Sequence, residues 1–318
     1  MPSTSPDAAA RAASPSSSAA SARRGLALLA AAGVLWGMGG PAGHLLQSAG
    51  AAPVAVATYR LLIAGLLITA FLAATGALRR LPRSRAFAVR LAANAVLHAV
   101  FQLLYFASLA LIPVGLATLV KIGSVPVFVA VGVCLLARRS PGARLAVSVL
   151  PAVAGLALLA GFPSVDASPA RLAAGLACAL GAGLAFSTMT LVNRRPVEGL
   201  PPLVNVGLGM LAGAVLLLPA GLFAGMAVPV RPDTLALLAF LGLVPTVLAY
   251  LAYFRGLQSA SDAGAAVGTL AEPMTAAVLS ALFFGERMTV PGLAGTALLA
   301  VSMSAEPVMD AVRRRLRR

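Results

Sequence analysis

Residues 243–286 read LVPTVLAYLAYFRGLQSASDAGAAVGTLAEPMTAAVLSALFFGE, and this stretch is the most informative part of the sequence for the fold. It joins the end of one apolar run, residues 234–255, to a second run, residues 263–284, through a short turn of small and polar residues. A helix needs roughly 20 mostly apolar residues to cross a bilayer. Both runs reach that length, so we expect two neighbouring membrane-spanning helices.

The composition extends this expectation to the whole chain. Of the 318 residues, 60% are hydrophobic and 10% are charged, whereas soluble domains are about half apolar and a quarter charged. This hydrophobicity excludes disorder, and two cysteines, Cys134 and Cys178, are too few for a disulfide scaffold. The net charge of +15 would suit nucleic acid only on a soluble surface. We therefore expect the lipid bilayer, and no nucleic acid, as a partner.

Ten apolar runs divide the chain, with Gly, Pro or Arg between them. They predict an all-α polytopic membrane protein with ten transmembrane helices. The third and fourth runs are joined closely through Ile112-Pro113-Val114, which leaves nine helices as an alternative. Residues 1–22, rich in Ser, Ala and Pro, predict a disordered cytoplasmic tail before an uncleaved first span. The runs are approximately 25–47, 53–76, 91–112, 115–137, 145–162, 171–192, 202–225, 234–255, 263–284 and 289–307.

The positive residues predict how the helices are oriented, because Lys and Arg gather in cytoplasmic loops. With the amino terminus inside, nineteen of the 24 fall on the cytoplasmic side, and only Arg171, Arg231 and Arg287 fall outside. The bias predicts a multi-pass protein of the cell (plasma or inner) membrane with both termini cytoplasmic, which requires an even number of spans. The cytoplasmic set is Arg11, Arg23, Arg24, Arg79, Arg80, Arg83, Arg85, Arg90, Arg138, Arg139, Arg144, Arg194, Arg195, Arg255, Arg313, Arg314, Arg315, Arg317 and Arg318.

A weak internal repeat divides the spans into two halves. Tyr105-Phe106 recurs as Tyr253-Phe254, and the spans that follow contain Pro126 and Pro273, which we expect to break their helices. Five spans per half would make the second copy insert upside down. Such inverted repeats are typical of secondary transporters, whose substrate binds near the midplane between the halves. We expect five-helix repeats at 23–162 and 163–308, and a basic cytoplasmic tail at 309–318.

The quoted stretch resembles the signature of the EamA family in the drug/metabolite transporter superfamily. The matching features are a Tyr-rich helix, a small-residue turn, Glu272-Pro273 in mid-span and Gly285-Glu286-Arg287 at the span's end. Leu35-Trp36-Gly37 resembles that family's first span, and Tyr59-Arg60 its second. The resemblance covers the chain after the tail and implies a ten-helix transporter of small metabolites, often an exporter.

The first half departs from this signature. Val125-Pro126 stands in place of Glu-Pro, and Leu136-Ala137-Arg138 in place of Gly-Glu-Arg. The matched acidic pair, one carboxylate per half, is therefore missing at these positions.

Three ionisable residues lie inside the runs, where charge is costly and usually functional. Glu272 lies about 14 Å into its span, near the middle of a roughly 30 Å core. Burial there favours the uncharged carboxyl, so Glu272 is a candidate for proton coupling. A structural role, bonding to backbone beside Pro273, is the alternative. Arg60 and Lys121 lie at similar depths, and they could attract an anionic substrate, pair with Glu272 or, for Arg60, snorkel to the surface.

Polar and aromatic residues complete the expected substrate cavity. Positions 94, 98, 102 and 105 are spaced by four and three, so they form one polar face of a helix. Such a face should line a cavity, with hydrogen bonding between helices as the alternative. Trp36 lies too deep for an interfacial belt, and Tyr250 and Tyr253 form a similar aromatic face. The expected cavity residues are Trp36, Arg60, Asn94, His98, Gln102, Tyr105, Lys121, Tyr250 and Tyr253.

The leading interpretation is a secondary transporter that exports amino-acid-like or drug-like solutes by alternating access. A sugar-nucleotide or phosphate exchanger is the closest rival, because Arg60 and Lys121 suit an anion. An intramembrane enzyme is less favoured: His44 and His98 are isolated and no zinc motif is present. A passive channel is also less favoured. We expect no catalytic residue, metal or cofactor, with protons as a candidate coupling ion and a homodimer left open.

Overall fold

The computed structural model describes residues 15–138, 150–158, 168–260, 270–287 and 289–302, and every regular element in these ranges is helical. Seven helical segments are long and apolar enough to cross a membrane, and the apolar helices Ala271–Phe284 and Val290–Ser302 are shorter. The labelled elements are α1 (Pro15–Gly37), α2 (Gly39–Ser48), α3 (Pro53–Ala74), η2 (Ala77–Arg80), α4 (Arg85–Leu109), α5 (Val114–Ala137), α7 (Pro169–Asn193), α8 (Pro202–Ala224), α9 (Pro232–Gly242), η3 (Leu243–Leu248), α10 (Ala249–Leu257) and α12 (Ala271–Phe284).

The all-helical membrane fold expected from the sequence is confirmed. Each of the ten apolar runs overlaps helix, including residues 150–158 in the fifth run. Residues 1–14 and 303–318, half of the fifth run and the start of the ninth lie outside the described residues, so a count of ten stays a prediction. Residues 15–22, which the sequence assigned to a disordered tail, form the start of α1. The close joint between the third and fourth runs is a turn at 110–113 between α4 and α5, which are separate helices.

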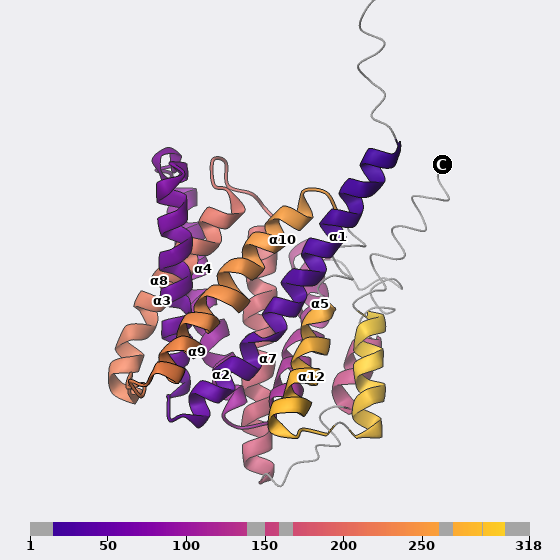
Figure 1. Cartoon of the computed structure of the whole chain (residues 1–318). Coiled ribbons are helices and arrows are strands. Elements are labelled where there is room, and N and C mark those ends of the chain that lie inside the picture. Colours follow the sequence, from indigo (N-terminus) through magenta and orange to yellow (C-terminus); the bar gives the residue numbers. More distant parts are fainter. Residues whose placement is uncertain (1–14, 139–149, 159–167, 261–269, 288, 303–318) are drawn as a thin grey trace, which may run out of the picture.

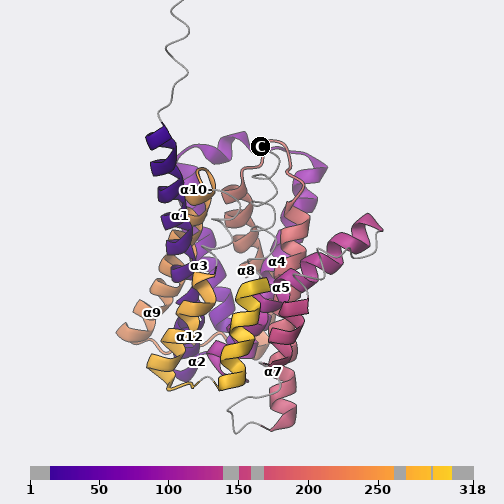
Figure 2. The same ribbon diagram turned by 90° about the vertical axis from the view of Figure 1, so that its right-hand side faces the viewer.

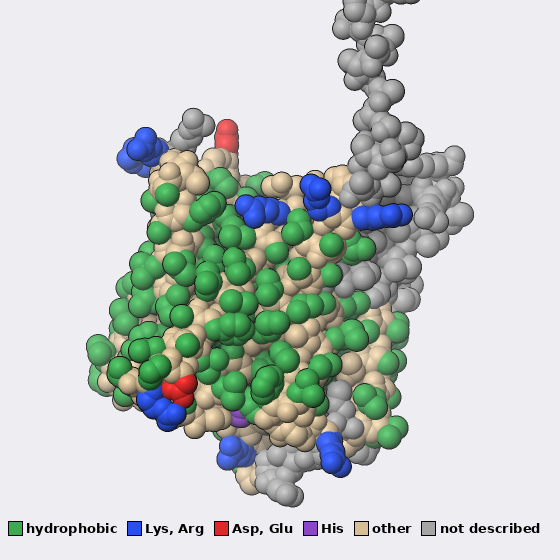
Figure 3. Space-filling view, in the orientation of Figure 1, with side chains coloured by type: hydrophobic (Ala, Val, Ile, Leu, Met, Phe, Trp, Pro, Cys, Tyr) green, Lys and Arg blue, Asp and Glu red, His purple; other side chains and the backbone are tan. Residues whose placement is uncertain are grey.

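The long helices form one bundle (Figure 1). In it, α3 packs on α8, α4 on α7 and α8, α5 on α7, and α1 on α10 and α12. Hydrophobic side chains cover the visible face between the two ends, and arginines gather at those ends (Figure 3). We call one end, where α1, α4 and η2 begin and α7 and α10 finish, the arginine-rich end. Its described arginines are Arg23, Arg24, Arg79, Arg80, Arg83, Arg85, Arg90, Arg194, Arg195 and Arg255.

The first membrane segment is interrupted at Met38, between α1 and α2, and glycines there allow two close contacts. A Cβ on Gly37 would lie 2.6 Å from the Glu272 carbonyl oxygen on α12. A Cβ on Gly39 would lie 3.1 Å from a guanidinium nitrogen of Arg60 on α3. Such approaches are too close for a larger side chain. The Gly-rich turn therefore brings α1 and α2 against the charged residues of two other helices.

Neither expected helix break takes the form that the sequence suggested. α5 is a single helix through Pro126, although its carboxyl-terminal part leans away from the bundle in Figure 2. Pro273 lies in the first turn of α12, which begins at Ala271. A proline there costs no helical hydrogen bond, because the first-turn N–H groups have no partner within the helix. The residues before this turn, 261–269, lie outside the described ranges.

The opposite end of the bundle is fastened by several polar contacts. The Glu286 carboxylate accepts hydrogen bonds from the backbone N–H groups of Val114 and Gly115, at 2.6 and 2.9 Å. His44 Nδ1 lies 3.1 Å from the Leu109 carbonyl oxygen. Arg171 donates to the carbonyl oxygens of residues 110 and 111. The turn between α4 and α5 is therefore held from α2, α7 and the end of α12.

Candidate functional site

A cavity of about 570 Å³ lies inside the bundle and is lined from both halves of the sequence. This volume is within the range of small-molecule sites. Eight lining positions belong to the residues predicted for the site: Trp36, Arg60, Gln102, Tyr105, Lys121, Tyr250, Tyr253 and Glu272, and Pro126 joins them from the predicted helix breaks. The other lining residues are Phe101, Ile122, Val125, Phe186, Met189, Thr190, Asn193, Arg194 and Val206.

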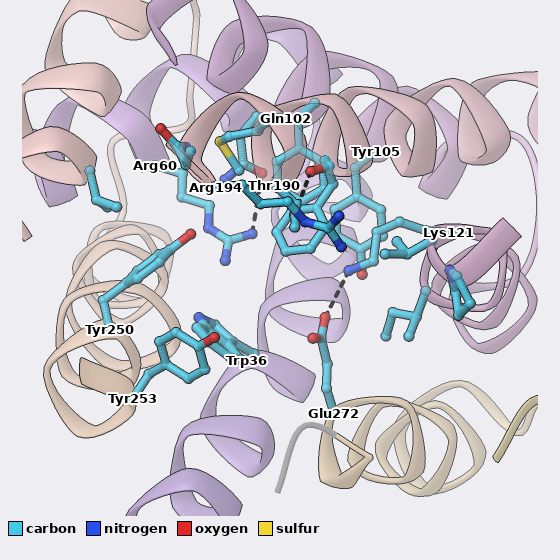
Figure 4. Close-up of a pocket in the computed structure, with 18 residues that line it drawn as sticks. Trp36, Arg60, Gln102, Tyr105, Lys121, Thr190, Arg194, Tyr250, Tyr253 and Glu272 are labelled. Carbon is cyan, nitrogen blue, oxygen red and sulfur yellow. Dashed lines mark hydrogen bonds and ion pairs between the residues drawn. The ribbon is translucent and has the colours of Figure 1, made fainter. Parts of the chain in front are cut away.

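An ion pair between the halves crosses one wall of the cavity. Lys121 Nζ on α5 lies 2.7 Å from Glu272 Oε1 on α12, and the side chains are 8% and 18% exposed. The Lys121 ammonium also lies 4.3 Å from the centre of the Tyr105 ring, within cation–π distance. Figure 4 shows the two charged groups pointing toward each other. The sequence left Arg60 and Lys121 as alternative ion-pair partners of Glu272, and the structure shows the pair with Lys121.

Arg60 lies in the same cavity without a carboxylate partner among the described residues. Its Nε donates to Thr246 Oγ1 at 3.0 Å, and its two terminal nitrogens lie 3.4 Å from Gln102 Oε1 and from the Pro245 carbonyl oxygen. The residue is 7% exposed, so its side chain does not snorkel to the surface. Figure 4 shows the guanidinium reaching into the space between Tyr250 and Gln102.

The partners of Arg60 come from an irregular part of the eighth predicted span. Residues Leu243–Leu248 form a π-helical turn between α9 and α10. Pro245 has no N–H, and Thr246 Oγ1 donates to the Leu241 carbonyl oxygen at 2.9 Å. π-helical turns recur at functional sites. Here the turn directs a backbone carbonyl and a hydroxyl toward a buried cation.

Aromatic rings form another wall of the cavity. The Trp36 ring lies 5.4 Å from that of Tyr250 and 5.0 Å from that of Tyr253, centre to centre. The rings meet edge-on or tilted, the geometry that aromatic pairs favour. Figure 4 shows these three residues facing the ion pair across the cavity. The predicted depth of Trp36 thus corresponds to a place on the cavity wall.

The cavity reaches the surface at the arginine-rich end. Thr190 and Arg194, at the end of α7, line it and are exposed, whereas Arg60, Gln102 and Lys121 are buried deeper in the bundle. Towards the opposite end, Tyr105 and Thr118 share a 2.8 Å hydrogen bond against Gly40. Among the described lining residues, the exposed ones therefore lie at the arginine-rich end.

Two residues of the predicted polar face, Asn94 and His98, lie elsewhere and are not among the lining residues. Asn94 hydrogen-bonds with Asn193 and Asn205, which joins α4 to α7 and α8. His98 is buried with Nδ1 2.8 Å from the Asn94 carbonyl oxygen and packs on Gly209. The face turns from a helix interface to the cavity along α4, so only Gln102 and Tyr105 reach the space.

Sequence reasoning missed several cavity residues. Asn193 and Arg194 are ordinary polar residues at a span's end, where they give no signal. Thr246, which bonds to Arg60 without lining the cavity, follows Pro245 in a span, and that proline was the available sign of an irregular helix. Within the described part of the chain no group of three or more metal-ligating residues occurs.

The fold and the cavity define a polytopic α-helical membrane protein with charged groups around a solute-sized internal space. The model of the EamA-like transporter family matches residues 23–161 and 173–304, and the chain belongs to this family. The predicted resemblance is thereby confirmed, and with it the assignment to the drug/metabolite transporter superfamily and a two-repeat membrane transporter.

Individual relatives agree with this assignment. The chain is 29% identical over 273 residues to "Uncharacterized transporter YwfM" of Bacillus subtilis (strain 168), covering 86% of this chain and 90% of the relative. It is 28% identical over 289 residues to "Uncharacterized inner membrane transporter YicL" of Salmonella typhimurium, covering 89% and 95%. A solved crystal structure shares the fold with a TM-score of 0.64 at 20% identity, covering 90% of this chain and 96% of the other.

Proposed function

We propose that the protein is a secondary active transporter that exports small amino-acid-like or drug-like solutes by alternating access. The observation that carries this proposal is the cavity between the halves, with a buried ion pair on its wall and access from one end. Secondary carriers bind solutes near the bilayer midplane between inverted halves. The bilayer and a small-molecule substrate are the partners this requires.

Opening to the other side would require the fastened end to separate. The contacts between the halves that must break there include those of the Glu286 carboxylate with the start of α5. They also include the hydrogen bonds from Arg171 to the carbonyl oxygens of residues 110 and 111. Rocking one half against the other would exchange these contacts for a closed arginine-rich end.

The Lys121–Glu272 pair is the proposed proton-coupling element. Protonation of a Glu272 carboxylate oxygen would remove the negative charge that holds the Lys121 ammonium at 2.7 Å. The pair would then separate, which frees α12 from α5. Because each helix comes from a different half, gain and loss of one proton could accompany the movement of the halves.

Flux measurements in proteoliposomes test the coupling. A panel of labelled amino acids and toxic metabolites, compared in cells with and without the protein, first identifies an exported solute. Flux of that solute in vesicles should change the internal pH, and Glu272→Gln should abolish the pH change. Unchanged proton-linked flux in Glu272→Gln would contradict the coupling role, whereas transport itself would stand.

The proposed location is the cell (plasma or inner) membrane with both termini cytoplasmic. The support is the concentration of arginines at the end where α1 begins, because positive residues favour the cytoplasmic side. The cavity would then face the cytoplasm in this structure, ready to load a solute for export.

A further inference from the structure

The charges of the cavity point to the class of solute that it binds. The Lys121 and Glu272 charges neutralise each other at 2.7 Å, whereas Arg60 has no carboxylate partner among the described residues. A buried cation without a counter-charge is costly, and a ligand anion can supply that charge. Among the described residues, the buried Arg60 guanidinium is therefore a positive charge without a counter-charge, deep in the cavity.

The Arg60 guanidinium is positioned to receive such an anion. A guanidinium has five N–H donors, and three contacts to neutral oxygens are present, two of them as long as 3.4 Å. The remaining N–H donors belong to the Arg60 side chain, which lines the cavity and is 7% exposed, so it is more than nine-tenths buried. A guanidinium pairs preferentially with a carboxylate, through two parallel hydrogen bonds in one plane.

The aromatic wall beside Arg60 indicates the rest of the ligand. Trp36, Tyr250 and Tyr253 present ring surfaces within the same space, and aromatic rings bind flat or apolar groups well. They could also hold a cation, but the Arg60 charge beside them opposes this. Among the described lining residues Glu272 is the one acid, and Lys121 already bonds to it, so the ammonium of an amino acid would find no free carboxylate there.

We propose that the cavity selects organic monoanions: the ligand's carboxylate binds Arg60, and its apolar or aromatic body lies against Trp36, Tyr250 and Tyr253. Among the described lining residues, Arg60 is the buried cation without a carboxylate partner, whereas Arg194 is exposed at the arginine-rich end. This inference rests on the proposed transport function, and it narrows the substrate to carboxylates without a balancing ammonium group.

Binding can be followed through the protein itself, because Trp36 is its single tryptophan and lines the cavity. The full chain in nanodiscs, excited where only tryptophan absorbs, is titrated with four compounds of one skeleton. They are 3-phenylpropionate (anion), phenylalanine (zwitterion), 3-phenylpropanamide (neutral) and 3-phenylpropylamine (cation). We expect 3-phenylpropionate to bind about tenfold more tightly than the other three, a difference of about 1.4 kcal/mol.

Variants assign the preference to Arg60. Arg60→Gln should weaken 3-phenylpropionate binding about tenfold and leave the amide within about twofold, and Arg60→Lys should fall between. Arg255→Gln is the matched control, since Arg255 is exposed on α10 and does not line the cavity. Helix content and a single elution peak establish that each variant folds, and the wild-type series tests the charge preference without any variant.

Several results would overturn the inference. Equal or tighter binding of the amide, the amine or phenylalanine would do so, as would unchanged affinity in a folded Arg60→Gln. No fluorescence response to any of the four would also contradict it. None of these outcomes concerns solute flux, so the transport proposal is judged separately by the vesicle experiments.

Discussion

At the scale of residues, the site depends on charges that are far apart in sequence and adjacent in space. Lys121 and Glu272 are 151 positions apart and meet at 2.7 Å. Removing one member of a buried ion pair is more damaging than removing both, because the remaining charge loses its counter-charge. The pair can therefore be tested by a double substitution.

We expect Lys121→Met alone to lower the free energy of unfolding by about 3 kcal/mol, the lower end for buried pairs because Glu272 is partly exposed to the cavity. Adding Glu272→Gln to that variant should restore at least half of the loss. Unfolding in SDS titrations measures both values. Strictly additive losses would show that the two groups do not interact.

The ionisable members of the site could be recognised from sequence, and its neutral members could not. Arg60, Lys121 and Glu272 stand out because a charge within an apolar run is rare. Gln102 and Asn94 share one polar face, yet only Gln102 reaches the cavity. A spacing of three and four residues identifies one face of a helix. It does not tell which other helix packs against each turn of that face.

At the scale of elements, two local features hold the helices in place: the carboxylate at the start of α5 and the glycines at helix crossings. Glu286 satisfies two backbone N–H groups that an α-helix leaves free at its amino terminus. The structure shows a cap on a helix from the other half of the chain.

Glu286→Ala should lower the free energy of unfolding by about 2 kcal/mol, because two hydrogen bonds to a charged group are lost. Glu286→Gln keeps one acceptor oxygen and should lose less. Asp233→Ala is the control, since that carboxylate is exposed and bonds only to its neighbours Arg231 and Thr234. A loss for Glu286→Ala no larger than for Asp233→Ala would contradict the capping role.

Gly43→Ala should destabilise the protein by about 1–3 kcal/mol, because the added Cβ would overlap the buried ring of Phe106. Gly292→Ala is the matched helical control: its nearest atom, Thr289 Oγ1, lies at 3.3 Å. That substitution should be neutral or gain up to about 1 kcal/mol from helix propensity. Thermal unfolding of both variants in one detergent compares them, and a stable Gly43→Ala would show that α2 and α4 are less closely packed.

At the scale of the whole molecule, hydrophobicity alone predicted most of the fold. Runs of about 20 apolar residues identify spans because the bilayer leaves backbone groups no other partner. Consecutive spans cross the bilayer in opposite directions, so the direction of each helix follows from its place in the chain. The α1–α2 turn and the π-helical turn were not predicted, since both arise from tertiary contacts at Gly39 and Arg60 rather than from hydropathy.

Access to the cavity from one end gives a prediction for the entire molecule. In a variant without Cys134 and Cys178, Thr190→Cys should react with a membrane-impermeant maleimide from the arginine-rich side. Ser48→Cys, exposed at the opposite end, should react only from the other side. Labelling inside-out and right-side-out vesicles compares the two. Reaction of both positions from the same side would contradict the orientation.

The central claim, that the cavity belongs to a carrier with alternating access, is tested most directly by solute counterflow in proteoliposomes. Vesicles loaded with an unlabelled exported solute are diluted into a trace of the labelled solute. We expect transient, saturable accumulation of label above equilibrium, which is absent from protein-free vesicles. Label that only equilibrates, at a rate proportional to concentration, would indicate a channel and rule out a carrier.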